Sequence, residues 1–173
     1  MSWLYRGVKS ITPKSVDWKY CGMHILNLSE QNNHEIIFND FEGVLLSLSA
    51  ENVSVVVDGV EFKLIGRTGV FAGISDWIYI PVGAKVGISG KNGLLALSTA
   101  QATKKFPAAY ISKDKVSVEI RGSGFATRQV NNIATPDSFI GAEKILVCEV
   151  ITPGGNWSSW PPHRHDGIAG CEF

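Results

Sequence analysis

The sequence predicts an all-β protein built as a sandwich or barrel. Glycine makes up 18 of the 173 residues and charged residues only 18%, a composition that many turns and much buried strand would produce. Short β-branched or alternating runs recur about every ten residues between turn-forming residues, and no segment keeps helical periodicity for three turns. Strands at that spacing favour a sandwich or barrel over a parallel α/β sheet.

The clearest local signal is a β-hairpin. The runs 53–57 and 60–65 flank Asp58-Gly59, a pair that readily adopts the two positive φ angles of a type I′ turn. Turn-forming residues also separate the other runs, at 39–40, 66, 81–83, 92–93, 122–124 and 135–137. Further strands are therefore expected at 23–28, 44–48, 77–80, 85–89, 94–98, 116–121, 127–133 and 144–151.

The charge balance excludes several classes of partner. The 16 basic residues match the 16 acidic ones, and no basic cluster is longer than Lys104-Lys105, so neither nucleic acid nor a membrane surface is an expected partner. No apolar run approaches the roughly 20 residues that cross a bilayer, and the N-terminus has no signal-peptide layout. We therefore expect a soluble cytoplasmic protein. Its three cysteines, Cys21, Cys148 and Cys171, are far apart, as reduced thiols would be.

A metal-binding pattern lies near the end of the chain. In an extended segment, His163 and His165 project to the same face, and Pro161-Pro162 restricts the backbone just before them. Imidazole suits several divalent ions, so the spacing does not choose among them. A chance pair of histidines remains the alternative, because two ligands do not complete a site. Cys171 and Glu172 follow, but the flexible stretch before them makes them poor candidates for the remaining ligands.

The other histidines, His24 and His34, each stand in or beside an expected strand without a second ligand nearby. Buried polar side chains usually find hydrogen-bond partners. We therefore expect both to be hydrogen-bonded structural residues.

A longer motif surrounds the histidine pair. Residues 149–166 contain the runs PGGNWSS and PPHRHD, and this segment resembles the most specific motif of the 5-deoxy-glucuronate isomerases of myo-inositol catabolism, the IolB family. The resemblance covers roughly residues 15–166. Upstream matches are Gly66-Arg67 with Val70-Phe71, the run 78–81, and Arg121-Gly122-Ser123-Gly124 followed by Arg128-Gln129-Val130.

The resemblance implies a cupin-like β fold and a metal-dependent isomerase. Members of the family are bicupins whose second barrel holds a divalent metal through the two histidines of the motif, a glutamate and a third histidine. On that mapping His163 and His165 are two of the four ligands, of zinc or manganese in our expectation, and Arg128 is a candidate for binding the substrate carboxylate or for a structural ion pair. The implied substrate is a small uronic acid, 5-deoxy-glucuronate, converted to 5-dehydro-2-deoxy-gluconate.

The resemblance ends at Asp166, because the last seven residues do not match the family's continuation. We therefore expect a truncated chain with an N-terminal cupin-like domain at 1–140 and the start of a second, metal-binding cupin domain at 141–173. On this hypothesis the metal site is incomplete, Glu172 does not replace the glutamate ligand, and activity is lost or impaired. The alternative is a non-catalytic cupin-like binding or structural module. An unpaired edge near 144–151 would also favour a homo-oligomer.

Overall fold

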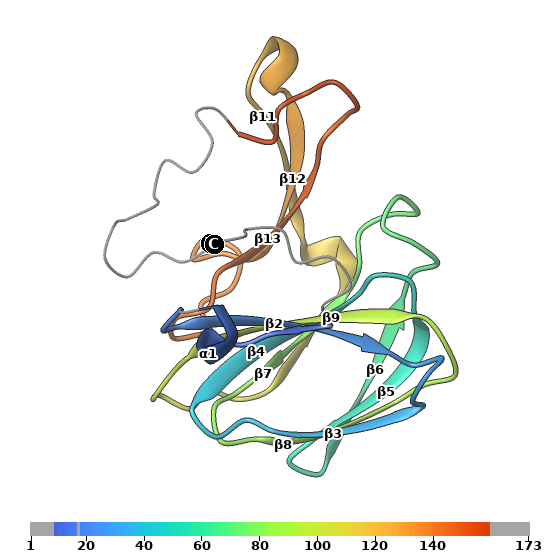
Figure 1. Cartoon of the computed structure of the whole chain (residues 1–173), viewed down its shortest axis with the longest axis vertical. Helices are drawn as coiled ribbons and strands as arrows, with labels where there is room; N and C mark the ends of the chain where they lie inside the picture. Colours follow the sequence, from blue (N-terminus) through green and yellow to red (C-terminus); the bar gives the residue numbers. More distant parts are fainter. Residues whose placement is uncertain (1–8, 17, 160–173) are drawn as a thin grey trace.

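The computed structural model describes residues 9–16 and 18–159, and it folds them into three antiparallel sheets (Figure 1). The strand orders are β1-β2-β9-β4-β7-β10 in the six-stranded sheet, β3-β8-β5-β6 in the four-stranded sheet and β11-β12-β13 in the three-stranded sheet. The strands are β1 (Ser10–Ile11), β2 (Cys21–Asn27), β3 (Asn33–Ile37), β4 (Phe41–Ser47), β5 (Glu51–Val57), β6 (Val60–Gly66), β7 (Trp77–Ile80), β8 (Lys85–Ser89), β9 (Leu94–Gln101), β10 (Ala109–Ile111), β11 (Ser117–Arg121), β12 (Arg128–Ala134) and β13 (Val147–Ile151).

Helical structure is brief in the described residues. It consists of α1 (Pro13–Val16) and two short 3₁₀ helices, Lys113–Lys115 and Gly124–Ala126. Within residues 9–16 and 18–159, no helix has the length and hydropathy that crossing a bilayer requires. The all-β prediction is confirmed.

The predicted hairpin is β5 and β6. Val57 pairs with Val60, and the two residues between them have positive φ angles, 48° at Asp58 and 84° at Gly59. This is the type I′ geometry expected from the Asp-Gly pair, whose twist matches that of the flanking strands. The Asp58 carboxylate also accepts a hydrogen bond from the Lys85 amide at 2.8 Å, and this contact holds the turn against the start of β8.

Most expected strands are present, and β7 and β8 have the predicted bounds. Three strands were missed, of which β1 has only two residues. β3 is an edge strand whose two apolar residues are adjacent in sequence. Ile36 is half-buried and Ile37 is 62% exposed, so apolar and polar residues do not alternate along the strand as its burial does. β10 has only three residues, all half-buried, and forms the opposite edge of the six-stranded sheet from β1.

The six-stranded sheet is buried on both faces, which explains why its central strands are apolar without alternation. In β7, Ile78 and Ile80 belong to the core shared with the four-stranded sheet, whereas Trp77 and Tyr79 belong to a second core on the opposite face. Successive side chains of a strand point to opposite faces, so one strand serves both cores. The first core makes the two larger sheets a sandwich, as predicted.

The second core is covered by the segment that leads into β13. The Phe139 ring packs edge-on against Trp77, with ring centroids 5.1 Å apart, and it also contacts Tyr79. The buried carboxylate of Glu42 on β4 accepts a hydrogen bond from the Tyr79 hydroxyl at 2.6 Å. It also accepts the backbone N–H groups of residues 143, 144 and 145, at 3.0, 2.5 and 2.7 Å. One side chain thus fixes this segment to the six-stranded sheet.

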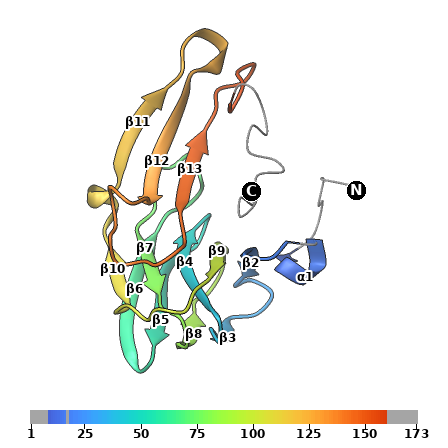
Figure 2. The same cartoon turned by 90° about the vertical axis from the view of Figure 1, so that its left-hand side faces the viewer.

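The three-stranded sheet extends away from the sandwich (Figure 2). β11 and β12 pair with β13 and not with the larger sheets. The predicted boundary between residues 140 and 141 falls between β12 and β13 along the chain, and the division into 1–140 and 141–173 stays a prediction. The sheet pairing nevertheless places the strands on either side of that boundary next to one another.

Candidate functional site

The predicted metal ligands His163 and His165 lie outside the described residues, as do Cys171 and Glu172. Among the residues that the structure describes, no three side chains of His, Cys, Asp or Glu gather as a metal site would require. Cys21 lies on β2 and Cys148 on β13, and no disulfide joins these two.

The segment that precedes the histidine motif packs on the tip of the β11–β12 hairpin. After β13, the Asn156 amide N–H donates to the Pro153 carbonyl and closes a turn. The Asn156 side chain donates to the carbonyl of Thr127 at 2.8 Å, and the Trp157 N–H donates to the carbonyl of Phe125 at 2.7 Å. The PGGNW part of the motif is therefore a turn fixed to the hairpin.

Two arginines lie side by side at this same end of the three-stranded sheet. Arg121 on β11 and Arg128 on β12 are cross-strand partners. Cross-strand partners in an antiparallel pair share one face, so the two positive charges repel each other unless an anion compensates them. Glu119 compensates Arg121, whose Nε donates to the carboxylate at 2.7 Å. This hydrogen bond lowers the pKa of Glu119 and raises that of Arg121.

Arg128 has no such carboxylate partner within residues 9–16 and 18–159. Its Nη1 donates to the carbonyl of Ala126 at 3.1 Å, and the side chain is half-buried. Gly122 permits this arrangement, because it has a φ of 82° and a Cβ there would lie 2.1 Å from the Ala126 oxygen. The ion-pair alternative therefore finds no support in the described residues, and carboxylate binding by Arg128 stays a prediction.

A buried ion pair lies on the other face of the three-stranded sheet. Arg67, which follows β6, donates from Nη1 and Nη2 to the two oxygens of Glu149 on β13, at 3.1 and 2.5 Å. The Asn131 side chain donates to the same carboxylate at 2.9 Å. Arg67 also donates to the carbonyls of Ser47 and Gly73, at 2.8 and 2.7 Å. The pair therefore fixes β13 to the sandwich.

The sequence did not predict the ion pair between Arg67 and Glu149, nor the place of Arg121 beside Arg128. Arg67, Glu149 and Arg121 all belong to the motifs that carry the family resemblance. That membership marks them as noteworthy, but 82 residues separate Arg67 from Glu149, and only the fold shows that they meet.

The two remaining histidines differ from each other. His24 on β2 shares a hydrogen bond of 2.5 Å between its Nδ1 and the hydroxyl of Ser10 on β1, as expected of a structural histidine. His34 on β3 does not follow the expectation, because its Nε2 is buried and has no hydrogen-bond partner in the part of the chain that the structure describes.

Burial lowers the pKa of His24 below its ordinary value. A histidine with a depressed folded-state pKa binds fewer protons when folded, so stability is present above the unfolded-state pKa and is lost as the pH falls through the folded-state pKa. We expect the free energy of unfolding to decline as the pH falls from about 7 through and below the ordinary histidine pKa of about 6.5, and His24→Leu to flatten that decline. Urea unfolding across this range measures it, and parallel curves for the two proteins would contradict the assignment.

The comparisons with known proteins agree on a single family. A model of the KduI/IolB family matches residues 5–170. The chain is 35% identical over 163 residues to a 5-deoxy-glucuronate isomerase of Geobacillus kaustophilus (strain HTA426), covering 92% of this chain and 58% of that protein. It is 32% identical over 164 residues to a 5-deoxy-glucuronate isomerase of Lacticaseibacillus casei, covering 93% of this chain and 60% of that protein.

A solved structure supports the same relationship. An IolB-like protein from Salmonella typhimurium LT2 superposes with a TM-score of 0.79 at 29% identity, over 88% of this chain and 58% of that one. The chain thus spans about three fifths of the length of the relatives it matches, 58% and 60% for the two isomerases above. Because the family match extends over nearly all of its residues, the chain belongs to the KduI/IolB family.

Proposed function

We propose that this chain takes part in the isomerisation of 5-deoxy-glucuronate to 5-dehydro-2-deoxy-gluconate, a step of myo-inositol catabolism in the cytoplasm. The observation that carries the proposal is the match to 5-deoxy-glucuronate isomerases over 92% of this chain, together with the family model, whose range of residues 5–170 includes the histidine motif. The alternative, a non-catalytic cupin-like module, is favoured by none of the relatives described above.

The reaction moves a proton from the carbon beside an aldehyde onto the aldehyde carbon. The hydroxyl on that neighbouring carbon loses its proton and becomes the ketone, and the aldehyde oxygen gains a proton and becomes a hydroxyl. We assign His163 and His165 as two ligands of a divalent ion, zinc or manganese. Such an ion, when bound, supplies a Lewis acid to the carbonyl and hydroxyl oxygens of the substrate. The two imidazoles suit zinc chemically, because imidazole nitrogen is a common zinc ligand, whereas manganese prefers oxygen ligands and would need them in the rest of its site.

Arg128 is the residue that we assign to the substrate carboxylate. Its side chain has donors beyond the one used by Ala126, and its charge is not paired with a carboxylate among the described residues. A guanidinium binds a carboxylate through two parallel hydrogen bonds. The turn at 153–157 packs on the same hairpin and leads along the chain towards His163. This proximity supports a common site for the carboxylate and the metal.

The proposal is tested by following the conversion of 5-deoxy-glucuronate by NMR, with the full chain and saturating Mn²⁺ or Zn²⁺. With only two of the four ligands assigned, we expect impaired, slow conversion that is still above a metal-only blank and is lost in the double variant His163→Gln, His165→Gln. Arg128→Gln should raise KM about 10- to 100-fold with a smaller change in kcat, because it removes a charged hydrogen bond made to the substrate throughout the reaction. Arg121→Gln is the matched control, since Glu119 already pairs with that arginine.

Two outcomes would contradict this assignment. A rate no higher than the blank would favour the non-catalytic module, and an unchanged KM in Arg128→Gln would remove the carboxylate role from that residue. Folding of each variant is checked by circular dichroism, so that a loss of activity is not caused by unfolding.

We also propose that the chain self-associates through β13. Within the described residues this strand pairs only with β12, so its other edge is unpaired. Val150, a residue of this strand, is 38% exposed. A strand with an unpaired edge is a template for pairing with another chain, and a lysine on it discourages that pairing. We expect a dimer fraction that grows with concentration in size-exclusion chromatography and decreases in Val150→Lys. An unchanged monomer at all concentrations would contradict the proposal.

A further inference from the structure

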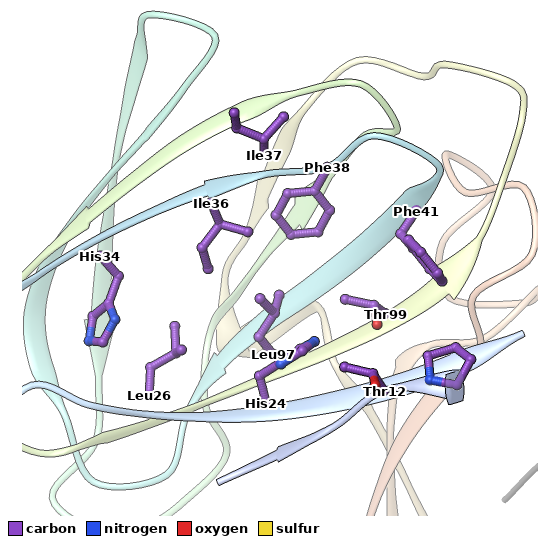
Figure 3. A pocket seen from close by; sticks show the side chains of 11 residues that line it. Thr12, His24, Leu26, His34, Ile36, Ile37, Phe38, Phe41, Leu97 and Thr99 are labelled. Carbon is purple, nitrogen blue, oxygen red and sulfur yellow. The ribbon is translucent and has the colours of Figure 1, made fainter. Parts of the chain in front are cut away.

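The cavity of the sandwich offers no charge to a sugar acid. It has a volume of about 420 Å³ and opens between β2 and β3, where Leu26, Ile36 and Phe38 line it (Figure 3). No Lys, Arg, Asp or Glu is among its lining residues. A carboxylate moved from water into such surroundings loses its hydration without gaining a counter-ion. An anionic ligand is therefore better matched by the charged face of the β11–β12 hairpin, which shares no residue with this cavity.

Three charged side chains share that face of the hairpin. Arg121 and Arg128 are cross-strand partners, and Glu119 lies two residues before Arg121 on β11, so all three side chains point to the same side of the sheet. Arg121 Nε donates to one oxygen of Glu119 at 2.7 Å, and the Asn132 side chain donates to the other at 2.6 Å. These two hydrogen bonds fix the carboxylate and lower the pKa of Glu119, so it is ionised at neutral pH.

The three side chains leave one positive charge uncompensated, because the Glu119 carboxylate balances only one of the two guanidinium groups. A single carboxylate bound at Arg128 compensates the remaining charge. A second anionic group on the same ligand would lie near Arg121, where the attraction of the guanidinium is offset by the repulsion of Glu119. This second group would therefore gain little, while part of its hydration is lost.

We propose that Glu119 determines specificity for charge: it lets the paired arginines hold one carboxylate and denies a second anionic group on the ligand any gain in affinity. The inference rests on the proposed function, in which Arg128 binds the substrate carboxylate. It adds a reason why the hairpin suits a uronic acid, which has a single carboxylate. An aldaric acid, which has a carboxylate at each end, gains nothing from its second charge.

The matched probes are gluconate and glucarate, which share one carbon chain and differ in a terminal hydroxymethyl group in place of a second carboxylate. Both are titrated into the full chain at low ionic strength without added metal, since salt screens exposed charges. The amide and arginine Nε–H signals of the hairpin in NMR spectra report binding. We expect wild-type affinities within about twofold of each other, because either carboxylate of glucarate can occupy Arg128.

Glu119→Gln should create a preference for the doubly charged probe. The Arg121 and Glu119 side chains are 50% and 47% exposed, so the effect is that of charges in water. One charge pair at about 4 Å in water corresponds to about a fivefold change in affinity, and we expect glucarate to bind this variant about fivefold more tightly than gluconate. An unchanged ratio in the folded variant would overturn the inference, as would a wild-type preference for glucarate of about fivefold.

Two further variants isolate the charge. Adding Arg121→Gln to Glu119→Gln should return the ratio to its wild-type value, because it removes the guanidinium near the second carboxylate. Glu35→Gln removes the same charge from an exposed position on β3 and should leave the ratio unchanged. A ratio that responds equally to Glu35→Gln would show a general effect of net charge and would contradict the role of Glu119.

The outcomes separate this inference from the proposed function. If both probes bind but the ratio does not respond to Glu119→Gln, the inference fails while the assignment of Arg128 stands. If neither probe binds, or if Arg128→Gln weakens neither, the assignment of Arg128 fails and the inference fails with it. Should Glu119→Gln not fold, the wild-type ratio decides alone.

Discussion

Glu42→Gln is expected to lower the free energy of unfolding by about 2–4 kcal/mol, because an amide cannot accept all four hydrogen bonds of the carboxylate. One carboxylate oxygen accepts the backbone N–H groups of residues 144 and 145, and the other accepts the N–H of residue 143 and the Tyr79 hydroxyl. Whichever way the glutamine amide turns, at least one backbone N–H faces an NH₂ group. The loss is measured by urea unfolding.

Tyr79→Phe is the matched control for this prediction, since it removes one donor and leaves the carboxylate and the backbone donors in place. Burial, with a further contribution from the hydrogen bond to Glu42, raises the pKa of Tyr79, so the hydroxyl stays protonated and donates. We expect this variant to lose only about 1 kcal/mol. If Glu42→Gln lost no more than Tyr79→Phe, the backbone contacts would not be what stabilises the segment over the second core.

Arg67→Met is expected to destabilise the chain by about 3–5 kcal/mol, the usual cost of removing one partner from a buried ion pair. The arginine side chain is 4% exposed and that of Glu149 is 16% exposed, so water screens the pair poorly. Methionine fills a similar volume but leaves the Glu149 carboxylate without its cation, and the carbonyls of Ser47 and Gly73 without their donor. Urea unfolding again provides the measurement.

The double variant Arg67→Met, Glu149→Leu separates the ion pair from the other contacts of the arginine. We expect it to be less destabilised than the sum of its two single variants, because the second change removes the unpaired charge left by the first. Arg67→Lys should not restore stability fully, since an ammonium group lacks the fork that reaches both carboxylate oxygens. Strict additivity of the two changes would show that the residues do not interact.

The sandwich could be predicted from the sequence because its determinants are local. The Asp58-Gly59 turn and the apolar runs of β7 and β8 each specify their structure within a few residues. The edge strand β3 could not be predicted, because the burial of its residues depends on which of its faces packs against the six-stranded sheet. Glu42 shows the same limit, as its partners at 143–145 follow it by about a hundred residues and meet it only in the fold.

The candidate site was predictable in part. The motif at 149–166 indicates the family and the histidines, and the fold adds that its PGGNW portion packs on the hairpin that carries Arg128. The pairing of Arg128 with Arg121 could not be inferred from spacing alone, because it depends on the register of β11 against β12. The unpartnered nitrogen of His34 was likewise invisible, since a sequence does not show which buried atoms lack partners.

The most direct test of the central claim is a calorimetric titration of the full chain with Zn²⁺, compared with the double variant His163→Gln, His165→Gln. The account predicts one ion per chain, bound at least about tenfold more weakly in the variant, because both imidazoles act as ligands. The same stoichiometry and affinity in both proteins would show that these histidines do not hold the metal, and the proposed function would lose its chemical basis.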